Sequence, residues 1–228
     1  MGNERARSVY VDDELRAEFP ELRVVELEVD GVRVKKSDSG LDRLKSKVYE
    51  EVRSSGMSLE TLKDEPVLRA YREFYWEVGI DPTKTRPAAE ALLRRVLGGK
   101  EIPAINTLVD AYNLVSLETS VAIAAFDCAS VHPESLKLRR AQAAEPFLGI
   151  GMSDPILLEG TEVVIEDMAA RELVAVYPFR NAERGKVTEA TRRAFLIMCG
   201  VPGIEDAPLE TARNLCQRYL SEYCSETS

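Results

Sequence analysis

Three polar side chains between residues 102 and 127 carry groups suited to binding a polar ligand. Asn106, Asp110 and Asn113 are separated by four and three residues, a spacing that aligns side chains along one stripe of an α-helix. An asparagine amide offers both donors and an acceptor, whereas an ionised aspartate offers only acceptors. This combination favours recognition of a polar small molecule over capture of a metal ion. The other side of the same helix would be apolar: Ile105, Leu108, Val109, Tyr112 and Val115.

The pattern leaves two interpretations of this stripe open. In the first, the polar side chains lie on a solvated face or cap the end of a helix, as polar stripes usually do. In the second, they line a cavity and present donors and acceptors to a ligand. Helical periodicity does not choose between the two, because both place the side chains on one face.

Other catalytic and metal-binding chemistry has little support in the sequence. His132 is the only histidine, and no G-x-S-x-G motif supplies a nucleophile for a histidine-dependent triad. The cysteines lie far apart and form no C-x-x-C pair: Cys128, Cys199, Cys216 and Cys224. Zinc sites need several Cys or His ligands at close spacing. We therefore expect free, largely buried thiols, no metal and no cofactor.

Composition and charge limit the class of protein and its partners. The chain has 228 residues, of which 45% are hydrophobic and 30% charged, as in a globular protein with a sizeable core. A net charge of −9 and a pI near 4.9 argue against a general nucleic-acid binder, and we expect no DNA partner. No apolar run approaches the ~20 residues that span a membrane, and the polar N-terminus lacks a secretory signal. We expect a cytoplasmic protein without a membrane partner.

Positive charge is nevertheless unevenly distributed along the chain. Basic residues cluster in three segments: Arg86, Arg94, Arg95 and Lys100; Lys137, Arg139 and Arg140; and Arg180, Arg184, Lys186, Arg192 and Arg193. Such a cluster is more often a solvated face than a phosphate site. If folding brought clusters together, an acidic protein could still hold a short stretch of RNA backbone.

Helices and strands must position these residues. Val25, Leu27 and Val29 alternate with charged residues before Asp30-Gly31, which predicts a hairpin ending near residue 34. Helical patterns predict helices over residues 41–55, 65–78, 87–97 and 209–223, and Thr188 is a suitable N-cap for a further helix over 189–199. Residues 162–167 and 172–177 are typical of strands, and residues 147–155 of a loop.

These elements predict an α+β (mixed α/β) fold, with a mostly antiparallel or mixed sheet covered by helices. We expect an N-terminal hairpin and helix, residues 1–60, to pack as part of the domain. Residues 61–228 would form the rest of it and end in the C-terminal helix.

Three segments follow one another in an order found in a known family. The first is D-P-T-K-T-R-P-A-A-E-A-L-L-R-R-V-L, similar to S-P-x-x-L-x-x-R-L. The second is I-N-T-L-V-D-A-Y-N-L with A-A-F-D, similar to I-N-N-x-V-D-x-T-N-Y with H-A-F-D. The third is V-I-E-D, L-V-A-V-Y-P-F-R and V-T-E-A-T-R-R, similar to a run that ends in V-T-E-x-T-R. From residue 69 to about residue 204, the chain thus resembles the B3/B4 domain, the editing module of the phenylalanyl-tRNA synthetase β subunit. It looks most like the free-standing, mostly archaeal version.

The resemblance implies a B3/B4-like fold with a pocket for the aminoacyl end of a tRNA. In the synthetase, the module hydrolyses the ester between a wrong amino acid, tyrosine, and the terminal ribose. Asn113 matches the pocket asparagine. Asp110 and Asp127 match two carboxylates of the motif, for which a structural role is an alternative to a role in the pocket. Ala175 lies where the synthetase begins an Ala-Gly pocket wall, and Tyr177 follows on the same strand.

Departures from the family pattern concern the side chains that select tyrosine. The family's pocket histidine corresponds to Ala124, and a glutamate of the family falls near the apolar Ile197. The Gly-Gly after the strand is replaced by Phe179-Arg180. An arginine at the pocket mouth could pair with a phosphate or a carboxylate, or it could be a surface side chain.

The resemblance leads to two hypotheses for function. In the first, a free-standing hydrolase acts in trans on mischarged aminoacyl-tRNA, with Asn113 orienting the substrate, Asp110 or Glu118 holding the water, and backbone N–H groups of residues 149–151 facing the oxyanion. Substrate-binding residues would be Asn106, Ala124, Asp127, Ala175, Tyr177 and Arg180. In the second, the protein binds a tRNA end, an amino acid or a nucleotide without chemistry. A deacylation assay distinguishes the two.

Overall fold

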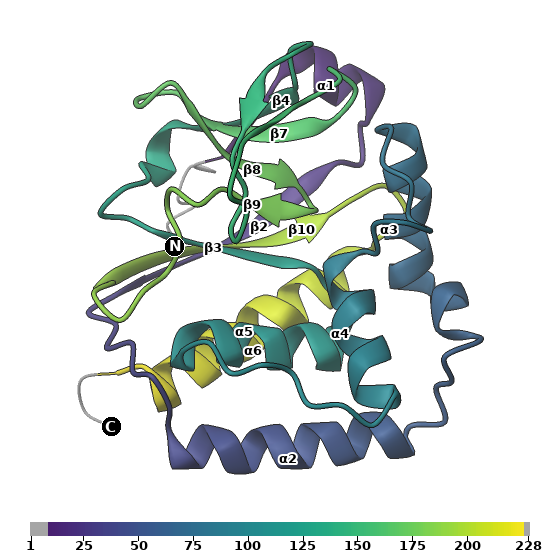
Figure 1. Ribbon diagram of the computed structural model, residues 1–228, viewed down its shortest axis with the longest axis vertical. Coiled ribbons are helices and arrows are strands. Elements are labelled where there is room, and N and C mark those ends of the chain that lie inside the picture. The colour runs from purple at the N-terminus through teal and green to yellow at the C-terminus, as the bar shows by residue number, and fades with distance from the viewer. Residues whose placement is uncertain (1–8, 226–228) are drawn as a thin grey trace, which may run out of the picture.

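The computed structural model describes residues 9–225 and arranges them in layers (Figure 1). A five-stranded sheet lies at the top of this view, a three-stranded sheet lies below it, and helices lie beneath the three-stranded sheet. The described elements form an α+β fold with mixed and antiparallel sheets. This confirms the fold class expected from the sequence.

The three-stranded sheet is antiparallel and has the order β2-β10-β3. Its strands are β2 (Arg23–Asp30), β10 (Arg193–Gly200) and β3 (Ile123–Asp127). Strand β10 is buried from Ala194 to its end, because partner strands pair with both of its edges and side chains pack on both of its faces. A strand covered on both faces is apolar along its length rather than at alternate positions.

The helix expected over residues 189–199 is wrong, because most of this segment is strand β10. Thr188 does act as a local cap, since its hydroxyl accepts a hydrogen bond from the Ala190 N–H. The turn closes with a bond from the Thr191 N–H to the Thr188 carbonyl, and no helix follows. A short apolar run bounded by turn residues fits a buried strand as well as a helix.

The hairpin expected near Asp30-Gly31 is also wrong. Strand β2 forms, but its partner is β10, with Leu27 opposite Leu196. Beyond the turn at Gly31, the Val32 N–H donates to the Arg192 carbonyl, and residues 32–34 are not a strand. Alternation predicts a strand but not its partner. The pairing joins β2 to the C-terminal part of the chain in one sheet. The division of the chain into residues 1–60 and 61–228 stays a prediction.

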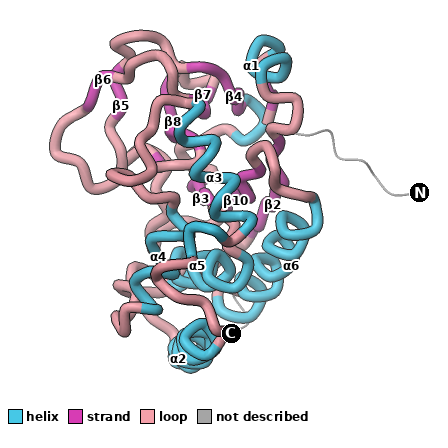
Figure 2. Tube along the Cα trace, turned by 90° about the vertical axis from the view of Figure 1, so that its right-hand side faces the viewer, coloured by secondary structure: helices cyan, strands magenta, loops and turns pink. Residues whose placement is uncertain are grey.

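The five-stranded sheet forms the other layer. Its order is β1 (Tyr10–Val11), β4 (Leu136–Arg140), β7 (Val163–Asp167), β8 (Glu172–Tyr177) and β9 (Arg180–Asn181). Only β1 and β4 are parallel, and the two strands expected over 162–167 and 172–177 are confirmed as β7 and β8. Val163 and Ile165 of β7 join the main core, whereas Val164 packs into a second cluster on the opposite face. The hairpin of β5 (Pro146–Phe147) and β6 (Ile156–Leu157) contributes Phe147 to that cluster and lies at the outer side of the sheet (Figure 2).

The helices lie close to the ranges expected from the sequence. They are α2 (Ser39–Ser54), α3 (Pro66–Glu77), α4 (Ala88–Leu97), α5 (Thr107–Thr119) and α6 (Asp206–Tyr223). Helices α5 and α6 pack against each other beneath the three-stranded sheet, and α2 lies below α5 (Figure 1). The short helix α1 (Asp13–Glu18) and the 3-10 turns η1 (Leu62–Asp64) and η2 (Pro133–Ser135) were not expected.

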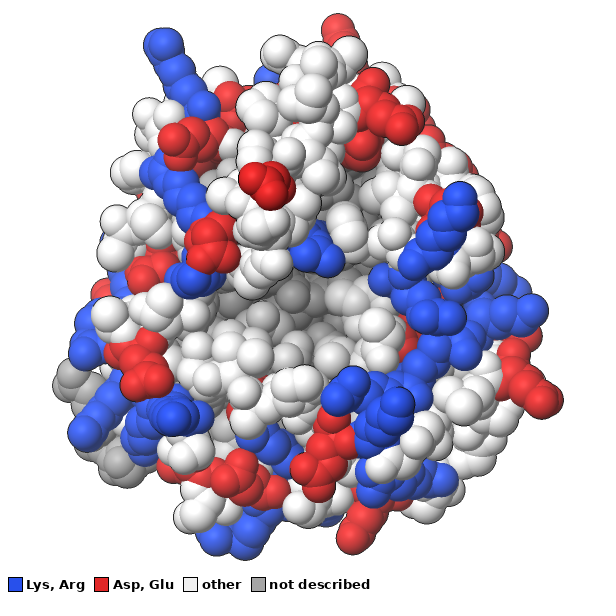
Figure 3. Space-filling view, viewed as in Figure 1, with Lys and Arg blue, Asp and Glu red and all other residues white. Residues whose placement is uncertain are grey.

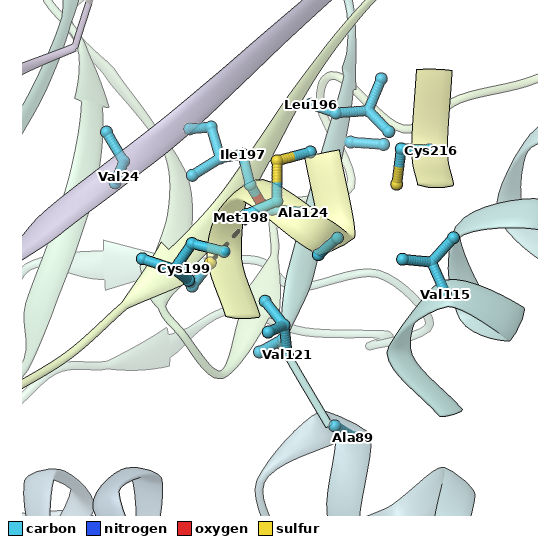
Figure 4. Close-up of a cluster of buried hydrophobic side chains, with 14 of the residues drawn as sticks. Val24, Ala89, Val115, Val121, Ala124, Leu196, Ile197, Met198, Cys199 and Cys216 are labelled. Carbon is cyan, nitrogen blue, oxygen red and sulfur yellow. Dashed lines mark hydrogen bonds between the residues drawn. The ribbon is translucent and has the colours of Figure 1, made fainter. Parts of the chain in front are cut away.

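The main core surrounds the three-stranded sheet, and Figure 4 shows part of it. Because side chains alternate along a strand, Ile197 and Cys199 share one face of β10. Ala124 pairs with Ile197 and therefore lies on that face as well. The cavity described below opens over this face, where the small side chain of Ala124 leaves room.

The described residues also bear on the expected membrane, metal and cysteine chemistry. Within residues 9–225, no helix is both long and apolar enough to cross a bilayer. In the same range, no group of three or more His, Cys, Asp or Glu side chains is placed to hold a metal ion. The cysteines are free, and all except Cys128 are buried.

Candidate functional site

A cavity of about 180 Å³ lies where the two sheets meet helices α4 and α5. Its walls combine residues from both sheets, both helices and the loop after β5: Ala88, Tyr112, Asn113, Ile123, Ala124, Ile150, Ile165, Ala175, Val176, Tyr177, Pro178, Phe179, Arg180, Asn181 and Cys199. Figure 3 shows this face of the molecule hollowed near its middle, with Lys and Arg side chains grouped to the right of the hollow. The cavity therefore depends on the packing of segments that are far apart in the sequence.

Asn113 brings an amide side chain from α5 to the cavity wall, next to the Tyr112 ring from the same helix. Helix α5 begins after its N-cap Asn106, and Asn113 follows seven residues later, or about two turns. Its side chain is half-buried and makes no hydrogen bond to any residue in the range 9–225. Both amide donors and the carbonyl acceptor are therefore available to a ligand.

Asn181 on β9 contributes a second amide to the cavity, and it is not among the site residues predicted from the sequence. Its side-chain Nδ2 donates to the Ala125 carbonyl at 3.1 Å, which ties the five-stranded sheet to β3. The Asn181 side-chain oxygen accepts no hydrogen bond from the described residues, so it remains an acceptor at the cavity wall. The only hint in the sequence is its place directly after the Phe179-Arg180 pair.

Two predicted binding residues, Ala124 and Ala175, form apolar walls of the cavity. Tyr177 also lines it, but its hydroxyl donates to the Gly200 carbonyl at 2.9 Å, and burial raises its pKa well above the ordinary value. The Tyr177 hydroxyl therefore serves the fold. Tyr71 has a similar supporting role, since its hydroxyl donates to the Cys199 carbonyl and accepts from the Ala122 N–H.

Asn106 and Asp110 lie outside the cavity and fix the start of α5. The Asn106 side chain accepts from the Val109 N–H at 3.0 Å and donates to the Val187 carbonyl at 3.3 Å. Asp110 accepts from the Ile105 N–H at 2.9 Å and lies 2.6 Å from the Lys45 ammonium. The contacts of these two residues therefore fit the first interpretation of the polar stripe, in which its side chains cap the end of a helix.

Asp127 and Glu118 are not brought to the cavity either. Asp127 accepts from the Thr191 hydroxyl at 2.7 Å and from the Ala129 N–H at 2.9 Å, and so fixes the turn after β3. Glu118 lies near the end of α5 and accepts from the Tyr219 hydroxyl at 2.8 Å. The predicted carboxylates thus have structural partners, and none of them lines the cavity.

Among the residues that the structure describes, Arg180 is the only charged side chain that lines the cavity. Its Nη1 donates to the Ile150 carbonyl at 3.1 Å, and its guanidinium carbon lies 5.2 Å from the centre of the Phe179 ring. The side chain passes directly over Gly149, where an added Cβ would meet the Arg180 Cδ and, at 3.0 Å, its Cγ. The glycine permits this close approach.

Two of the backbone donors expected to face an oxyanion in residues 149–151, those of Ile150 and Gly151, are occupied. The Ile150 N–H donates to the Asn181 carbonyl at 2.9 Å. The Met152 N–H donates to the Gly149 carbonyl at 3.0 Å, and the Gly151 N–H bonds to the Glu183 carboxylate and helps to lower its pKa. This loop shapes the cavity mouth through Ile150 without offering these N–H groups.

Outside the cavity, His132 forms a cluster with Ser135 and Asp167. The cluster has the residue types of a catalytic triad but not its geometry. The His132 Nδ1 lies 2.9 Å from the buried Asp167 carboxylate, and the Ser135 hydroxyl donates to the same carboxylate at 2.8 Å. A triad needs the histidine between the nucleophile and the acid, whereas here the aspartate lies between the other two. The cluster holds the turn η2 against the end of β7.

A basic cleft of about 360 Å³ adjoins the cavity and shares Phe179 and Arg180 with it. Its lining comes from the start of α4, the loop before it and the β8–β9 turn: Lys84, Thr85, Arg86, Ala91, Arg94, Phe179 and Arg180. No Asp or Glu belongs to this lining. Helix α4 begins next to this cleft, and its first turn has no side-chain cap. The positive end of the helix dipole therefore lies beside the same surface.

The comparisons with known proteins agree on one domain. Residues 70–225 match the family model of the B3/4 domain. The fold is similar to the crystal structure of an N-terminal fragment of the phenylalanyl-tRNA synthetase β-subunit from Pyrococcus horikoshii, with a TM-score of 0.50 and 17% sequence identity. The match covers 94% of this chain and 48% of that one, so the chain spans about half the length of the synthetase fragment. No curated protein matches the sequence.

Proposed function

Because the chain belongs to the B3/4 domain family, we propose that its cavity receives the aminoacyl end of a tRNA and that the protein hydrolyses the ester of mischarged aminoacyl-tRNA. The observation that carries this proposal is the Asn113 side chain, a half-buried amide without a partner among the described residues, in a cavity with mostly apolar walls. Ligand sites combine these two features: apolar walls for burial and a few polar groups for orientation. The relation to the synthetase β-subunit supports tRNA as the partner.

The size of the cavity suits one amino-acid side chain. A space of ~150 Å³ is enough to admit a benzene ring, and the cavity measures about 180 Å³. Ala124 and Ala175 keep it open because larger side chains at either position would fill it. The family's selection of tyrosine does not carry over, because Ala124 stands where the family has its pocket histidine.

Ester hydrolysis in such a cavity relies on position rather than on a protein nucleophile. A water oxygen bonds to the ester carbonyl carbon, the bond from that carbon to the ribose oxygen breaks, and the ribose oxygen leaves with a proton. In this proposal, the Asn113 amide donates to the oxygen on which negative charge develops. Holding water and ester together lowers the remaining barrier.

A second function, binding without hydrolysis, is favoured by one observation. No Asp, Glu, His or Lys belongs to the cavity lining, so no wall residue offers a general acid or base near neutral pH. In this alternative, the same contacts hold the aminoacyl group or a free amino acid, and the ester stays intact.

A deacylation screen tests the proposal. The protein is incubated with a panel of mischarged tRNAs, and released amino acid is measured for the unchanged chain, for Asn113→Ala and for Asn214→Ala. Asn214 is exposed on α6 away from the cavity, so it provides the same chemical change as a control. We expect at least one tRNA to be deacylated faster than in buffer, Asn113→Ala to lose ~100-fold or more of that rate, and Asn214→Ala to retain it.

The same panel separates the two functions. If no tRNA is deacylated but mischarged tRNA binds and Asn113→Ala weakens binding, the protein is a binding module. If Asn113→Ala deacylates as fast as the unchanged chain, the proposed role of the cavity is contradicted.

A further inference from the structure

The basic cleft beside the cavity differs from the basic segment around β4 in how its charges are paired. In the segment around β4, carboxylates neutralise each cation: Lys137 forms an ion pair with Asp12, and Arg139 lies 2.5 Å from Glu166. In the cleft, Arg86 is exposed and has no hydrogen bond or ion pair with any residue between 9 and 225. Among residues 9–225, the Arg180 guanidinium donates a hydrogen bond only to the Ile150 carbonyl and lies over the Phe179 ring, with no carboxylate partner.

The other two cations of the cleft are only partly neutralised. Arg94 lies 2.7 Å from the buried Glu90 carboxylate, but Arg72 shares that carboxylate at 3.1 Å, so the group of three keeps a net positive charge. Lys84 lies 3.7 Å from Asp81, with 84% of its side chain exposed to solvent. An excess of positive charge therefore remains on this surface, on a chain whose net charge is −9.

From this arrangement we propose that the cleft binds backbone phosphates of the single-stranded nucleotides that precede the terminal ribose. The inference rests on the proposed function, because that function places the end of a tRNA in the cavity. The cleft and the cavity share Phe179 and Arg180 as a common wall. A strand whose end enters the cavity would therefore carry its nearest phosphates past Arg180 and Arg86.

The chemistry of the cleft fits phosphodiester groups. Phosphate oxygens accept hydrogen bonds from arginine in paired, charge-assisted geometry. Cations that contact a nucleic-acid backbone release bound counterions, which makes the affinity depend on salt concentration. The cleft is small and local, which explains how an acidic protein can bind RNA without a broad basic face.

Fluorescence anisotropy with a short single-stranded RNA that ends in C-C-A, without an amino acid, tests the inference. Binding is measured at several salt concentrations for the full chain, Arg86→Ala and Arg33→Ala. Arg86 is exposed and unpaired, so its replacement removes charge without breaking a contact of the fold. Arg33 is the matched control: it is exposed, no described residue pairs with its side chain, and its N–H bonds to Cys224 at the far end of α6.

We expect Arg86→Ala to weaken RNA binding about 10-fold, the size of one lost charged hydrogen bond, and to reduce the slope of log affinity against log salt by ~0.7. Arg33→Ala should change neither quantity. Equal affinities and slopes for Arg86→Ala and the unchanged chain would overturn the proposal, as would an equal loss with Arg33→Ala. AMP bound as tightly as the RNA would also overturn it, because the cleft would then hold one free phosphate rather than a strand.

The result is separable from that of the deacylation screen. If RNA binds through Arg86 but no mischarged tRNA is hydrolysed, the proposal that the cleft binds phosphates is supported and the hydrolase assignment is contradicted. If Asn113 proves essential for deacylation while Arg86→Ala alters neither RNA binding nor deacylation, the hydrolase assignment is supported and the proposal that the cleft binds phosphates is contradicted.

Discussion

The Asp110 carboxylate lies 2.6 Å from the Lys45 ammonium, and the two side chains are 3% and 14% exposed. This pair joins the start of α5 to α2. It explains why a residue aligned with Asn113 in the sequence does not reach the cavity. Its consequence for the site is indirect, because fixing the start of α5 sets where Asn113 lies along the helix.

Replacing Asp110 with Asn should therefore lower stability and spare the site. The replacement leaves the Lys45 ammonium with one carboxylate partner, the more exposed Asp42 at 3.1 Å. Loss of a charged hydrogen bond typically costs ~1–3 kcal/mol, and we expect the free energy of unfolding to fall by about that much. Chemical denaturation measures the change, and replacing Lys45 with Met in the same chain should restore part of the loss. If Asp110→Asn abolished deacylation without altering stability, Asp110 would be catalytic after all.

Filling the cavity should block the site at little cost to the fold. Ala124→Leu places a larger side chain in open space, so the free energy of unfolding should change by less than ~1 kcal/mol, whereas binding of an aminoacyl group is lost. Ala125→Leu is the control, because Ala125 is buried on β3 outside the cavity lining and should incur the full ~1–3 kcal/mol of overpacking. Titration calorimetry and denaturation measure the two effects. Undiminished binding by the Ala124 variant would place the ligand elsewhere.

Gly149→Ala should displace Arg180, because the new Cβ would meet the arginine side chain. The arginine is flexible, so stability should change by less than ~1 kcal/mol, while RNA affinity falls several-fold. A double-mutant cycle with Arg180→Ala checks the cause. In the Arg180→Ala background, Gly149→Ala should have no further effect on affinity, and an additive loss would show that the glycine acts by another route.

Stability should decline at alkaline pH because of buried groups on α6. Burial raises the pKa of Tyr219 from 10.0 to about 12 and that of the Cys216 thiol from 9.0 to about 12. At a pH between the ordinary pKa and the raised pKa of each group, the folded chain keeps a proton that the unfolded chain loses. The free energy of unfolding therefore falls as pH rises. The stabilisation that these two groups give the folded chain is complete below pH 9 and is lost toward pH 12. Denaturation at several pH values measures it, and Tyr219→Phe should flatten the decline. A steeper decline in that variant would refute the assignment.

Local signals in the sequence predicted most helices and part of the sheet. Helix α4 begins directly after Pro87 and ends at Gly98, and α5 begins after Asn106, because capping and periodicity act within a few residues. Strand β10 was missed because its apolar run has no period that marks a strand. The partner of β2 was missed because pairing with β10 joins segments that are far apart in the chain.

Motifs in several segments predicted part of the candidate site, since Asn113, Ala124, Ala175, Tyr177 and Arg180 all line the cavity. Asn113 was found through a motif within α5 and lies in the cavity. Asn181, Phe179 and Arg86 come from two other segments, and only the tertiary fold places them around Asn113 or beside it. Asp110 shows the converse error, since helical alignment with Asn113 did not bring its carboxylate to the same space. Glu118, predicted to hold the water, lies near the end of α5 and also outside the cavity lining.

The central claim is that the Asn113 side chain binds an aminoacyl group in the cavity. A crystal structure with an aminoacyl-adenosine analogue, in which an amide replaces the ester, tests it most directly. We expect the aminoacyl group between Ala124 and Ala175, with the Asn113 amide ~3 Å from a polar atom of the analogue. An analogue bound outside this cavity, or inside it without contact to Asn113, would contradict the account.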